Sequence, residues 1–535
     1  MNDADCARPA THASVPPWTA SAPWVLGLLA VWLLATAGLR PLLLPDEARY
    51  AEVAREMLAG DGWVPLLNGL PFFHKPPLTY WIDLGGMRLF GITPFAARMG
   101  PALGAWLMGA ALWLSLRQRQ GARTAGIALV VLATSPFVYI GGQYANHDML
   151  VAGTITAAVL CLARALDCRA ANTAGVSGGN GGTGGAGVTG GTGALRWLVA
   201  GWAACGLAVL SKGLIGVVLP ALIVGPWLLW QRRWRDVFWL LHPLGLAAFA
   251  VVALPWMLLM QGRYPGFFDY FIVEQHFRRY ATLGFNNQQP AWFLIAVLPL
   301  LTLPWSAAAL PALRRLWPGG ARAPAPPGAG GMTGLMVWWV VAVLGFFSLP
   351  ASKLVGYIMP ALAPWCLLLA APLAASRWWR PIAGLAAVVS VGTVVALAWQ
   401  APKSNRDIGL ELRQRAAPDD RVVFVDDPFH DVAFYARLSA PALLASAWDD
   451  PEIPRRDNWR KEIADATRFD SAGAAATLLH IDRLPTLVCQ GRRVWLVTTG
   501  DRPAALAAVP GARLVVQGRH AQLWLAAPRA CPAGQ

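Results

Sequence analysis

Charged side chains are scarce in this chain of 535 residues. They make up 14% of it, whereas hydrophobic residues make up 56% and tryptophan occurs 27 times. This balance excludes a soluble globular protein. About eleven apolar runs are long enough to cross a bilayer, so we expect a polytopic α-helical membrane protein. The runs lie near residues 22–44, 93–116, 124–141, 147–166, 195–210, 213–230, 239–260, 291–312, 333–350, 354–373 and 379–399.

Acidic residues are the scarcer of the two charge classes, with 29 against 44 basic residues and a net charge of +15. In a soluble protein this excess would suggest a nucleic-acid partner. Here the arginines gather in every second loop between the apolar runs, which is the positive-inside pattern of membrane proteins. We therefore expect no nucleic acid, a cytoplasmic N-terminus at residues 1–21, and outer loops at 45–92 and 262–290. The cytoplasmic arginines are Arg117, Arg119, Arg123, Arg164, Arg169, Arg232, Arg233, Arg235, Arg314, Arg315, Arg377 and Arg380.

The sequence also lacks a credible nucleotide-binding element. Residues 171–194 form a tract rich in Gly and Thr that matches glycine-rich motifs by accident, because no strand precedes it and no helix with an acidic partner follows. We interpret the tract as a flexible cytoplasmic linker. An exported site has no access to ATP or nucleotide sugars, so an activated substrate would have to arrive in the lipid.

The domain layout follows from these patterns. The first apolar run is too long for a signal peptide and has no small-residue cleavage site after it, so we expect an uncleaved anchor. Residues 22–400 are then a transmembrane domain. In residues 401–535 charges rise, apolar runs shorten, and β-branched residues alternate or cluster as in strands at 421–426, 493–498 and 513–516, so we expect a small periplasmic α/β domain there. Cys489 and Cys531 both fall there, where a disulfide is allowed but not required.

Residues 44–78 concentrate the ionic chemistry directly after the first apolar run. Asp46 and Glu47 end that run, and Arg49, Glu52, Arg55 and Glu56 follow at spacings of three and four, which places them on one face of a helix at the membrane surface. Lys75 precedes Pro76-Pro77, which stiffen the backbone around it. A solvated loop is the alternative. Interleaved aromatic residues favour a site that holds something both ionic and apolar.

Other predicted outer loops supply further candidates. Asp148 begins the fourth predicted span, as either a site carboxylate or a helix N-cap. Lys212 either reaches toward lipid headgroups or faces an anion. His276 is either structural or, with His74, half of a metal pair. Two more sets complete the group: Gln275 and Arg279 on one expected helix face, and Lys353 with Tyr357 in a short turn. Several cations around one leaving group suit a phosphate, and a carboxylate can remove a proton from the incoming acceptor.

Five motifs together resemble bacterial polyprenyl-phosphate-dependent glycosyltransferases, the family of the lipid A 4-amino-4-deoxy-L-arabinose transferases and the related protein O-mannosyltransferases. They are LPDEARYAE (44–52), HKPPLTYW (74–81), NHDML (146–150), HFRRY (276–280) and SKL with YIMP (352–354 and 357–360). The resemblance implies the type C glycosyltransferase fold with about 11 to 13 transmembrane helices. It also implies transfer of a sugar from undecaprenyl phosphate to lipid A or another envelope glycan, with inversion. A protein Ser/Thr acceptor, or a lipid-linked sugar flippase, remains the alternative, although no internal repeat favours a transporter.

Carried over to this sequence, the resemblance makes Asp46 and Asp148 catalytic. It assigns the donor phosphate to Arg49, Lys75, Arg279, Lys353 and Tyr357, and a divalent metal, zinc or magnesium, to His74 and His276. The chain departs from the family at two positions: His74 stands where the family usually has Glu, and Gln275 stands where Glu often precedes the histidine. The first departure leaves a metal ligand in place but puts the identity of the metal in doubt. The second weakens a direct transfer of the lipid A function.

Overall fold

The computed structural model describes residues 21–177, 189–278, 287–314, 329–374, 376–400, 403–500, 506 and 509–529. By its internal contacts the chain divides into two units. The first comprises residues 1–37, 100–259 and 287–394, and the second comprises residues 38–99, 260–286 and 395–535. The predicted outer loops 45–92 and most of 262–290 therefore pack with the C-terminal region. The predicted domain boundary at residue 400 marks the end of the apolar runs in the sequence, whereas the division into two units follows the internal contacts of the chain.

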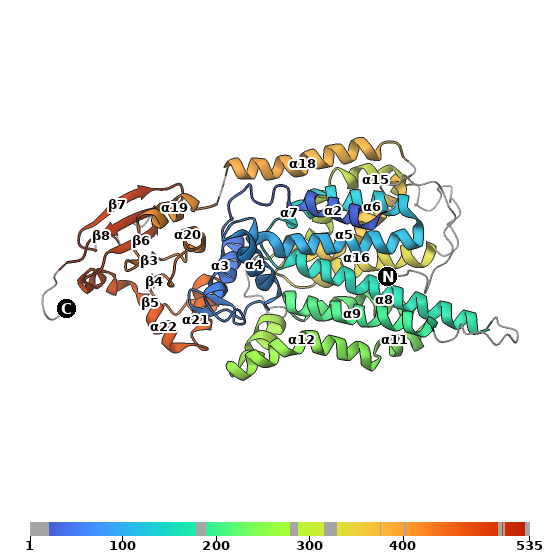
Figure 1. Cartoon of the computed structure of the whole chain (residues 1–535), viewed down its shortest axis with the longest axis horizontal. Coiled ribbons are helices and arrows are strands. Elements are labelled where there is room, and N and C mark those ends of the chain that lie inside the picture. Colours follow the sequence, from blue (N-terminus) through green and yellow to red (C-terminus); the bar gives the residue numbers. More distant parts are fainter. Residues whose placement is uncertain are drawn as a thin grey trace. The chain divides into compact units, whose positions relative to one another are not determined.

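The first unit is built from helices, of which the long ones run beside one another (Figure 1). A bundle of this kind satisfies every backbone polar group within each helix, as a membrane interior requires. Its elements are α2 (Ala22–Leu34), α5 (Met99–Gln120), α6 (Ala122–Thr134), α7 (Pro136–Gly141), α8 (Asp148–Ser177), α9 (Thr189–Lys212), α10 (Ile215–Trp230), α11 (Trp234–Leu240), α12 (Pro243–Arg263), α14 (Phe293–Leu301), α15 (Trp305–Arg314), α16 (Ala329–Ser348), η4 (Val355–Ala361), α17 (Leu362–Leu373) and α18 (Trp379–Gln400).

Each predicted apolar run contains a helix, although the run 22–44 is helical only at Ala22–Leu34, and the polytopic membrane fold is confirmed. Within the described ranges, seven helices are long and apolar enough to cross a membrane, and α2, α6 and α10 are shorter apolar helices. Two predicted spans are each split in two. The run 124–141 breaks between α6 and α7 at Ser135-Pro136, and 291–312 breaks between α14 and α15 before Trp305. A proline lies at each break, Pro136 at the first and Pro304 at the second. Each helix is interrupted there because the proline ring lacks a backbone donor and clashes with the preceding turn.

Glycine permits the closest approach in the bundle, between α5 and α8. A Cβ atom at Gly153 would lie 2.1 Å from the carbonyl oxygen of Gly104. The two backbones therefore touch, as small residues allow in membrane helix pairs. This contact holds α8 in place, and Asp148 is its first residue.

The second unit begins with the predicted outer loop, which is mostly helical. The helix predicted from the spacing of Arg49, Glu52, Arg55 and Glu56 is present as α3 (Asp46–Ala59), and a second helix, α4 (Leu78–Phe90), follows. Asp46 and Glu47 lie in the first turn of α3, where carboxylates complement the helix dipole. Gly91, with φ 74°, ends α4 in a conformation that favours glycine. A hairpin of β1 (Leu66–Leu67) and β2 (Leu70–Pro71) joins the two helices, and η2 (Ala96–Arg98) follows them.

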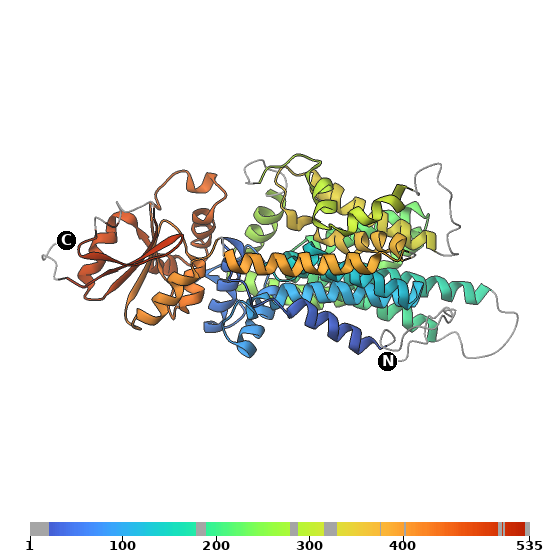
Figure 2. The same ribbon diagram turned by 90° about the horizontal axis from the view of Figure 1, so that it is seen from above.

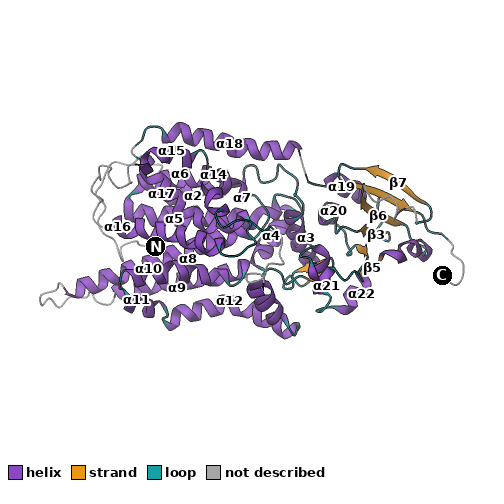
Figure 3. Ribbon diagram, turned by 180° about the vertical axis from the view of Figure 1, so that it is seen from behind, coloured by secondary structure: helices purple, strands orange, loops and turns teal. Residues whose placement is uncertain are grey.

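The predicted α/β region forms one sheet in the strand order β5-β4-β3-β6-β8-β7, twisted and flanked by helices (Figures 2 and 3). The strands β5, β4, β3 and β6 are parallel to one another, whereas β8 runs antiparallel to its two neighbours, β6 and β7. Its elements are α19 (Arg406–Arg415), β3 (Arg421–Val425), α20 (His430–Ala436), β4 (Leu443–Ser446), η5 (Ile453–Arg455), α21 (Trp459–Ala466), α22 (Ser471–Thr477), β5 (Leu478–His480), η6 (Ile481–Gln490), β6 (Val494–Thr499), β7 (Ala512–Gln517) and β8 (Ala521–Ala526).

Both faces of the central strand β3 are buried, and its side chains alternate between them. Val423 and Val425 of β3 pack with Leu487 of η6. Phe424, between them, belongs to a second core that includes Val432 of α20 and Val53 of α3. The helix that carries the ionic motif is thus part of the core of the second unit. The predicted strands at 421–426, 493–498 and 513–516 are confirmed.

Candidate active site

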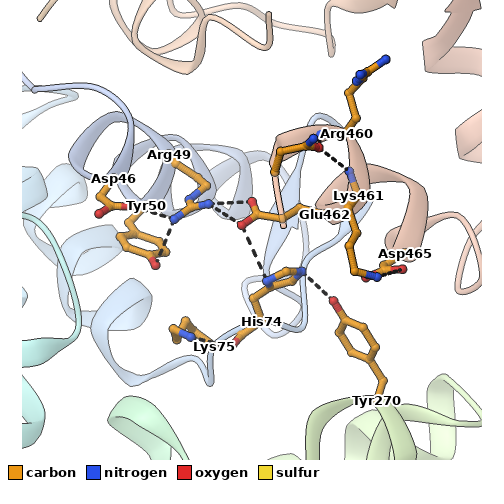
Figure 4. Close-up of polar contacts among 11 residues, drawn as sticks. Asp46, Arg49, Tyr50, His74, Lys75, Tyr270, Arg460, Lys461, Glu462 and Asp465 are labelled. Atoms are coloured by element: carbon orange, nitrogen blue, oxygen red, sulfur yellow. Dashed lines mark hydrogen bonds and ion pairs between the residues drawn. The ribbon is translucent and has the colours of Figure 1, made fainter. Parts of the chain in front are cut away.

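Arg49 of α3 is shared between two carboxylates (Figure 4). Its Nη2 atom donates to Asp46 Oδ1 at 2.7 Å, one helical turn away. Its Nη1 atom donates to both carboxylate oxygens of Glu462, each at 2.6 Å. The guanidinium also lies over the ring of Tyr50, 4.9 Å from the centroid. The side chain of Asp46 is 42% exposed, whereas Glu462 is 14% exposed. The arrangement holds one carboxylate at the surface and another inside.

Glu462 is a permanently ionised group in this cluster. Burial alone would raise the pKa of its carboxyl, but the charge of Arg49, with smaller contributions from His74 and His430, lowers that pKa to about 2. His430 shows the opposite response: burial, together with the nearby Arg49, lowers the pKa of its imidazole to about 3 and keeps it neutral. The charge of Arg49 is therefore balanced inside the protein by Glu462 at every ordinary pH.

The charged face of α3 is not solvated, which corrects the expectation of a charged helix lying on a membrane surface. Glu47 is buried and pairs with Arg40 and Arg98. Glu52 and Arg55 are also buried and form two hydrogen bonds of 2.7 Å with each other. These pairs satisfy charges that would otherwise be costly to bury. Residues from the C-terminal sheet domain cover this face.

His74 lies at the other side of Glu462. Its Nδ1 atom is 3.9 Å from Glu462 Oε1, and its Nε2 atom shares a 2.6 Å hydrogen bond with the hydroxyl of Tyr270. Tyr270 belongs to η3 (Asp269–Arg278), which is a π-helix. The α-helical spacing expected for residues 275–280 is therefore wrong at residues 275–278, the part of this segment that the structure describes. Lys75 donates to the carbonyl oxygen of His74 at 3.2 Å. The sequence pair His74-Lys75 thus reaches the Arg49 cluster through Glu462.

His74 and His276, the residues predicted to hold a metal, are both engaged in hydrogen bonds. His276 shares its Nδ1 atom with the carbonyl oxygen of Phe271 at 2.6 Å, and His74 is engaged as described above. Over the described ranges, no group of three or more His, Cys, Asp or Glu side chains is placed to bind a metal ion. We assign no step to a metal, and a metal requirement stays a prediction from the family resemblance.

A second ionic cluster lies in the first unit, where the ends of α8 and α9 meet η4. The ammonium of Lys212 pairs with Asp148 and lies 4.8 Å from the centroid of the Tyr357 ring. Lys212 thus faces an anion, one of its two predicted roles. Asp148 is the first residue of α8 and so follows the N-cap position, and its backbone N–H donates to Asn146 Oδ1 at 3.0 Å. A Cβ atom at Gly356 would lie 2.0 Å from Asp148 Oδ2, so only glycine leaves room for this carboxylate.

Lys353 is placed differently from the prediction. Its ammonium is buried and donates to the carbonyl oxygens of Gln289 at 2.7 Å and Pro350 at 2.5 Å. This is a structural contact within the turn, and a role in binding the donor phosphate stays a prediction. Arg279 lies outside the described residues. Cys489 is disulfide-bonded, whereas Cys531 also lies outside the described residues, so their pairing stays a prediction.

The cluster around Arg49 supplies the components of group transfer from a phosphate. A half-exposed carboxylate, Asp46, can accept a proton. Arg49 and Lys75 can stabilise charge that develops on a leaving phosphate. Residue spacing predicted the contact of Asp46 with Arg49. Glu462, His430 and Tyr270 were missed, because a glutamate within Trp459–Ala466 has the sequence pattern of an ordinary solvated helix.

Comparison with known proteins supports the motifs. Residues 35–271 match the family model described as dolichyl-phosphate-mannose-protein mannosyltransferase. The undecaprenyl phosphate-alpha-4-amino-4-deoxy-L-arabinose arabinosyl transferase of Erwinia tasmaniensis is 34% identical over 345 residues, or 64% of this chain. A similarly named transferase of Pseudomonas fluorescens is 32% identical over 359 residues, or 66% of the chain. The matches span only 57% and 59% of those two relatives.

A solved structure extends the comparison over almost the whole chain. The crystal structure of ArnT from Cupriavidus metallidurans bound to undecaprenyl phosphate superimposes with a TM-score of 0.75, covering 95% of this chain and all of that one, at 22% identity. At this identity the likeness concerns the fold. The chain is thus a multi-span membrane protein with the type C glycosyltransferase fold and a C-terminal α/β domain, and its resemblance to the polyprenyl-phosphate-dependent glycosyltransferases is confirmed.

Proposed function

We propose that this protein is an inner-membrane glycosyltransferase that moves a sugar from a polyprenyl phosphate, undecaprenyl phosphate in the first instance, to lipid A or another envelope glycan. The observation that carries the proposal is the position of Asp46, half-exposed and held by Arg49 at the start of α3. The named transferases that the chain resembles act from undecaprenyl phosphate carrying 4-amino-4-deoxy-L-arabinose. That sugar is our first choice of donor.

The reaction is a single displacement with inversion. The acceptor oxygen forms a bond to the anomeric carbon of the sugar, and the bond from that carbon to the phosphate oxygen breaks. Asp46 accepts the proton that the acceptor oxygen loses, if it carries one. The leaving polyprenyl phosphate gains negative charge, which Arg49 and Lys75 stabilise.

The alternation of arginine-rich loops supports a periplasmic active site, because it places residues 45–92 outside the membrane. This orientation explains why the donor is lipid-linked. A reporter fusion or cysteine labelling at Asp61, which is exposed in the loop after α3, tests the orientation. Labelling of a cysteine there by a membrane-impermeant reagent in intact spheroplasts is expected. Labelling only after lysis would reverse the topology.

A protein O-mannosyltransferase is the second candidate, and one observation favours it: the family model that matches residues 35–271 is that of the dolichyl-phosphate-mannose-protein mannosyltransferases. The two candidates differ in donor sugar and acceptor. They share the proposed use of Asp46 and the cations around it.

One experiment tests both. Purified protein is incubated with undecaprenyl-phosphate-linked 4-amino-4-deoxy-L-arabinose and lipid A, or with a polyprenyl-phosphate-linked mannose and a Ser/Thr peptide, and labelled product is counted. Asp46→Asn should lower the rate about 10²- to 10⁴-fold, the range for losing a general base. Asp419→Asn, at an exposed position in the sheet domain, is the matched control and should keep full activity. Equal activity of Asp46→Asn and wild type would reject the role of Asp46.

A further inference from the structure

A basic cavity lies within the second unit, away from the Arg49 cluster. Its volume is about 170 Å³, roughly ten times what one water molecule needs. Four arginines line it: Arg40, Arg406, Arg413 and Arg437. No acidic residue is among the described residues that line it. The cavity therefore combines space with a concentration of positive charge.

Three of the four arginines are not neutralised. Arg40 pairs with Glu47, but Arg406 and Arg413 form no ion pair with any residue in the described ranges, and Arg437 donates only to the carbonyl oxygen of Ile92, at 3.1 Å. The pKa of Arg437 is lowered, first by partial burial and then by the nearby charge of Arg413. Like charges held together without a counter-charge attract an anion.

Two carboxylates on the helices that line the cavity are engaged elsewhere. On α19, Glu411 pairs with Arg415 at 2.7 Å. On α20, Asp431 accepts the backbone N–H of Asn405 at 2.5 Å. Neither is available to neutralise the cavity. Its wall is closed instead by the apolar ring of Phe434 and by Tyr435, whose hydroxyl accepts the backbone N–H of Leu42 at 2.8 Å.

The position along the chain points to the membrane surface. Gly38 follows closely after Leu34, the end of the apolar helix α2, and Arg406 follows closely after Gln400, the end of the span α18. Both lie within about 20 Å of chain from a helix end. Large apolar side chains are exposed in this unit, including Leu39 at 54% and Phe90 at 54%, which are close in the chain to Arg40 and Ile92, and Trp399 at 86%, near the end of α18. Such residues are typical of the layer where lipid headgroups meet acyl chains.

We propose that this cavity binds the phosphate of an anionic lipid headgroup, with Arg406, Arg413 and Arg437 as its ligands. Arginine suits this role because its planar fork donates two hydrogen bonds to phosphate oxygens. The lipid is distinct from the sugar donor, and its binding does not depend on the proposed transferase activity. Arg40, on the floor of the cavity, pairs with Glu47, so a bound lipid would contact the network that holds the start of α3.

Binding isotherms with the purified full-length protein in detergent test the proposal. The probes are dioctanoyl phosphatidic acid, glycerol 3-phosphate, which has the same headgroup without acyl chains, and dioctanoylglycerol, which has the chains alone. Wild type should bind phosphatidic acid, and Arg406→Gln/Arg413→Gln should bind it at least about tenfold more weakly. Arg406→Lys/Arg413→Lys should retain most of the affinity, which would also show that the site tolerates substitution.

Two controls locate the effect. Arg483→Gln/Arg492→Gln removes the same charge from exposed positions of the sheet domain and should bind like wild type. Lys75→Gln alters the candidate donor site and should also leave phosphatidic acid binding unchanged. Equal losses in either control, or unchanged binding in Arg406→Gln/Arg413→Gln, would overturn the site. Binding of glycerol 3-phosphate as tight as that of the lipid would overturn the lipid source while supporting a phosphate site.

Discussion

The two ionic clusters solve the same problem, a cation beside a carboxylate at the end of a helix, in different ways. In the first unit Lys212, at the end of α9, pairs with Asp148, at the start of α8. Asp148 also accepts a hydrogen bond from Asn146, which lies two residues before it. In the second unit Arg49 has a local partner, Asp46, and a remote one, Glu462, which is 413 residues away. The first cluster is a property of the bundle. The second requires the C-terminal domain, so its charge balance depends on a contact that local sequence does not encode.

The largest expected effect comes from breaking the remote contact. Arg49→Ala leaves Glu462 largely buried without its cation and should destabilise the protein by about 3 kcal/mol, toward the lower end for a broken buried pair. Glu462→Gln combined with Arg49→Met should recover much of the loss, since neither buried charge then remains. Thermal unfolding in detergent measures both. A loss below about 1 kcal/mol in Arg49→Ala would mean the pair behaves as an exposed one.

The corresponding change in the first unit is steric. Gly356→Ala places a methyl group where the Asp148 carboxylate lies and should displace it from Lys212, at a cost of about 1 to 3 kcal/mol. Gly345→Ala is the matched control, because no atom lies within 4 Å of a Cβ there. Comparing the unfolding temperatures of the two variants checks the prediction. Equal temperatures would show that the Asp148 side chain can move without cost.

Acid should loosen the second cluster through His430. Its folded pKa of about 3 is below the ordinary value of 6.5, so between these values the unfolded chain binds a proton that the folded protein does not. Stability is therefore complete above pH 6.5 and falls as the pH drops toward 3, by up to about 1.4 kcal/mol per pH unit. His430→Gln should flatten this dependence in unfolding measured between pH 7 and 5. The same slope in the variant would assign the effect to other groups.

The smallest effect should come from Tyr270→Phe, which removes the hydroxyl bonded to His74. We expect a loss of about 1 kcal/mol, the usual contribution of one hydrogen bond. Phe277→Tyr, at an exposed position of the same π-helix, is the matched control. Phe271→Tyr is unsuitable because the Phe271 ring is buried. Unfolding temperatures again provide the measurement. A Tyr270→Phe variant as stable as the control would mean that water replaces the hydroxyl.

Local patterns in the sequence predicted what local physics determines. The apolar runs became helices, the spacing of Asp46 and Arg49 became a contact, and alternating β-branched residues became β3, β6 and β7. The short parallel strands β4 and β5 were missed because three or four apolar residues carry little signal. The type of helix at Asp269–Arg278 was also missed, since a π-helix has no distinct periodicity over so short a segment.

The candidate site was predictable in its residues but not in its partners. The motifs indicated Asp46, His74, Lys75 and Asp148, and the lipid-phosphate chemistry followed from their types. No pattern pointed to Glu462, because the fold alone brings α21 to α3. The buried state of Glu52 and Arg55 was unpredictable for the same reason. Charges three or four apart look solvated until a distant domain covers them.

The separation between Arg49 and Glu462 also sets an order of events during synthesis. At about 5 to 20 residues per second, some 20 to 80 s pass between the emergence of Arg49 and that of its buried partner. Throughout that interval Arg49 lacks its buried partner, and α3 has only local ion pairs, such as those of Arg49 with Asp46 and Arg55 with Glu52. The region that carries the proposed chemistry is thus among the first to be made and among the last to mature.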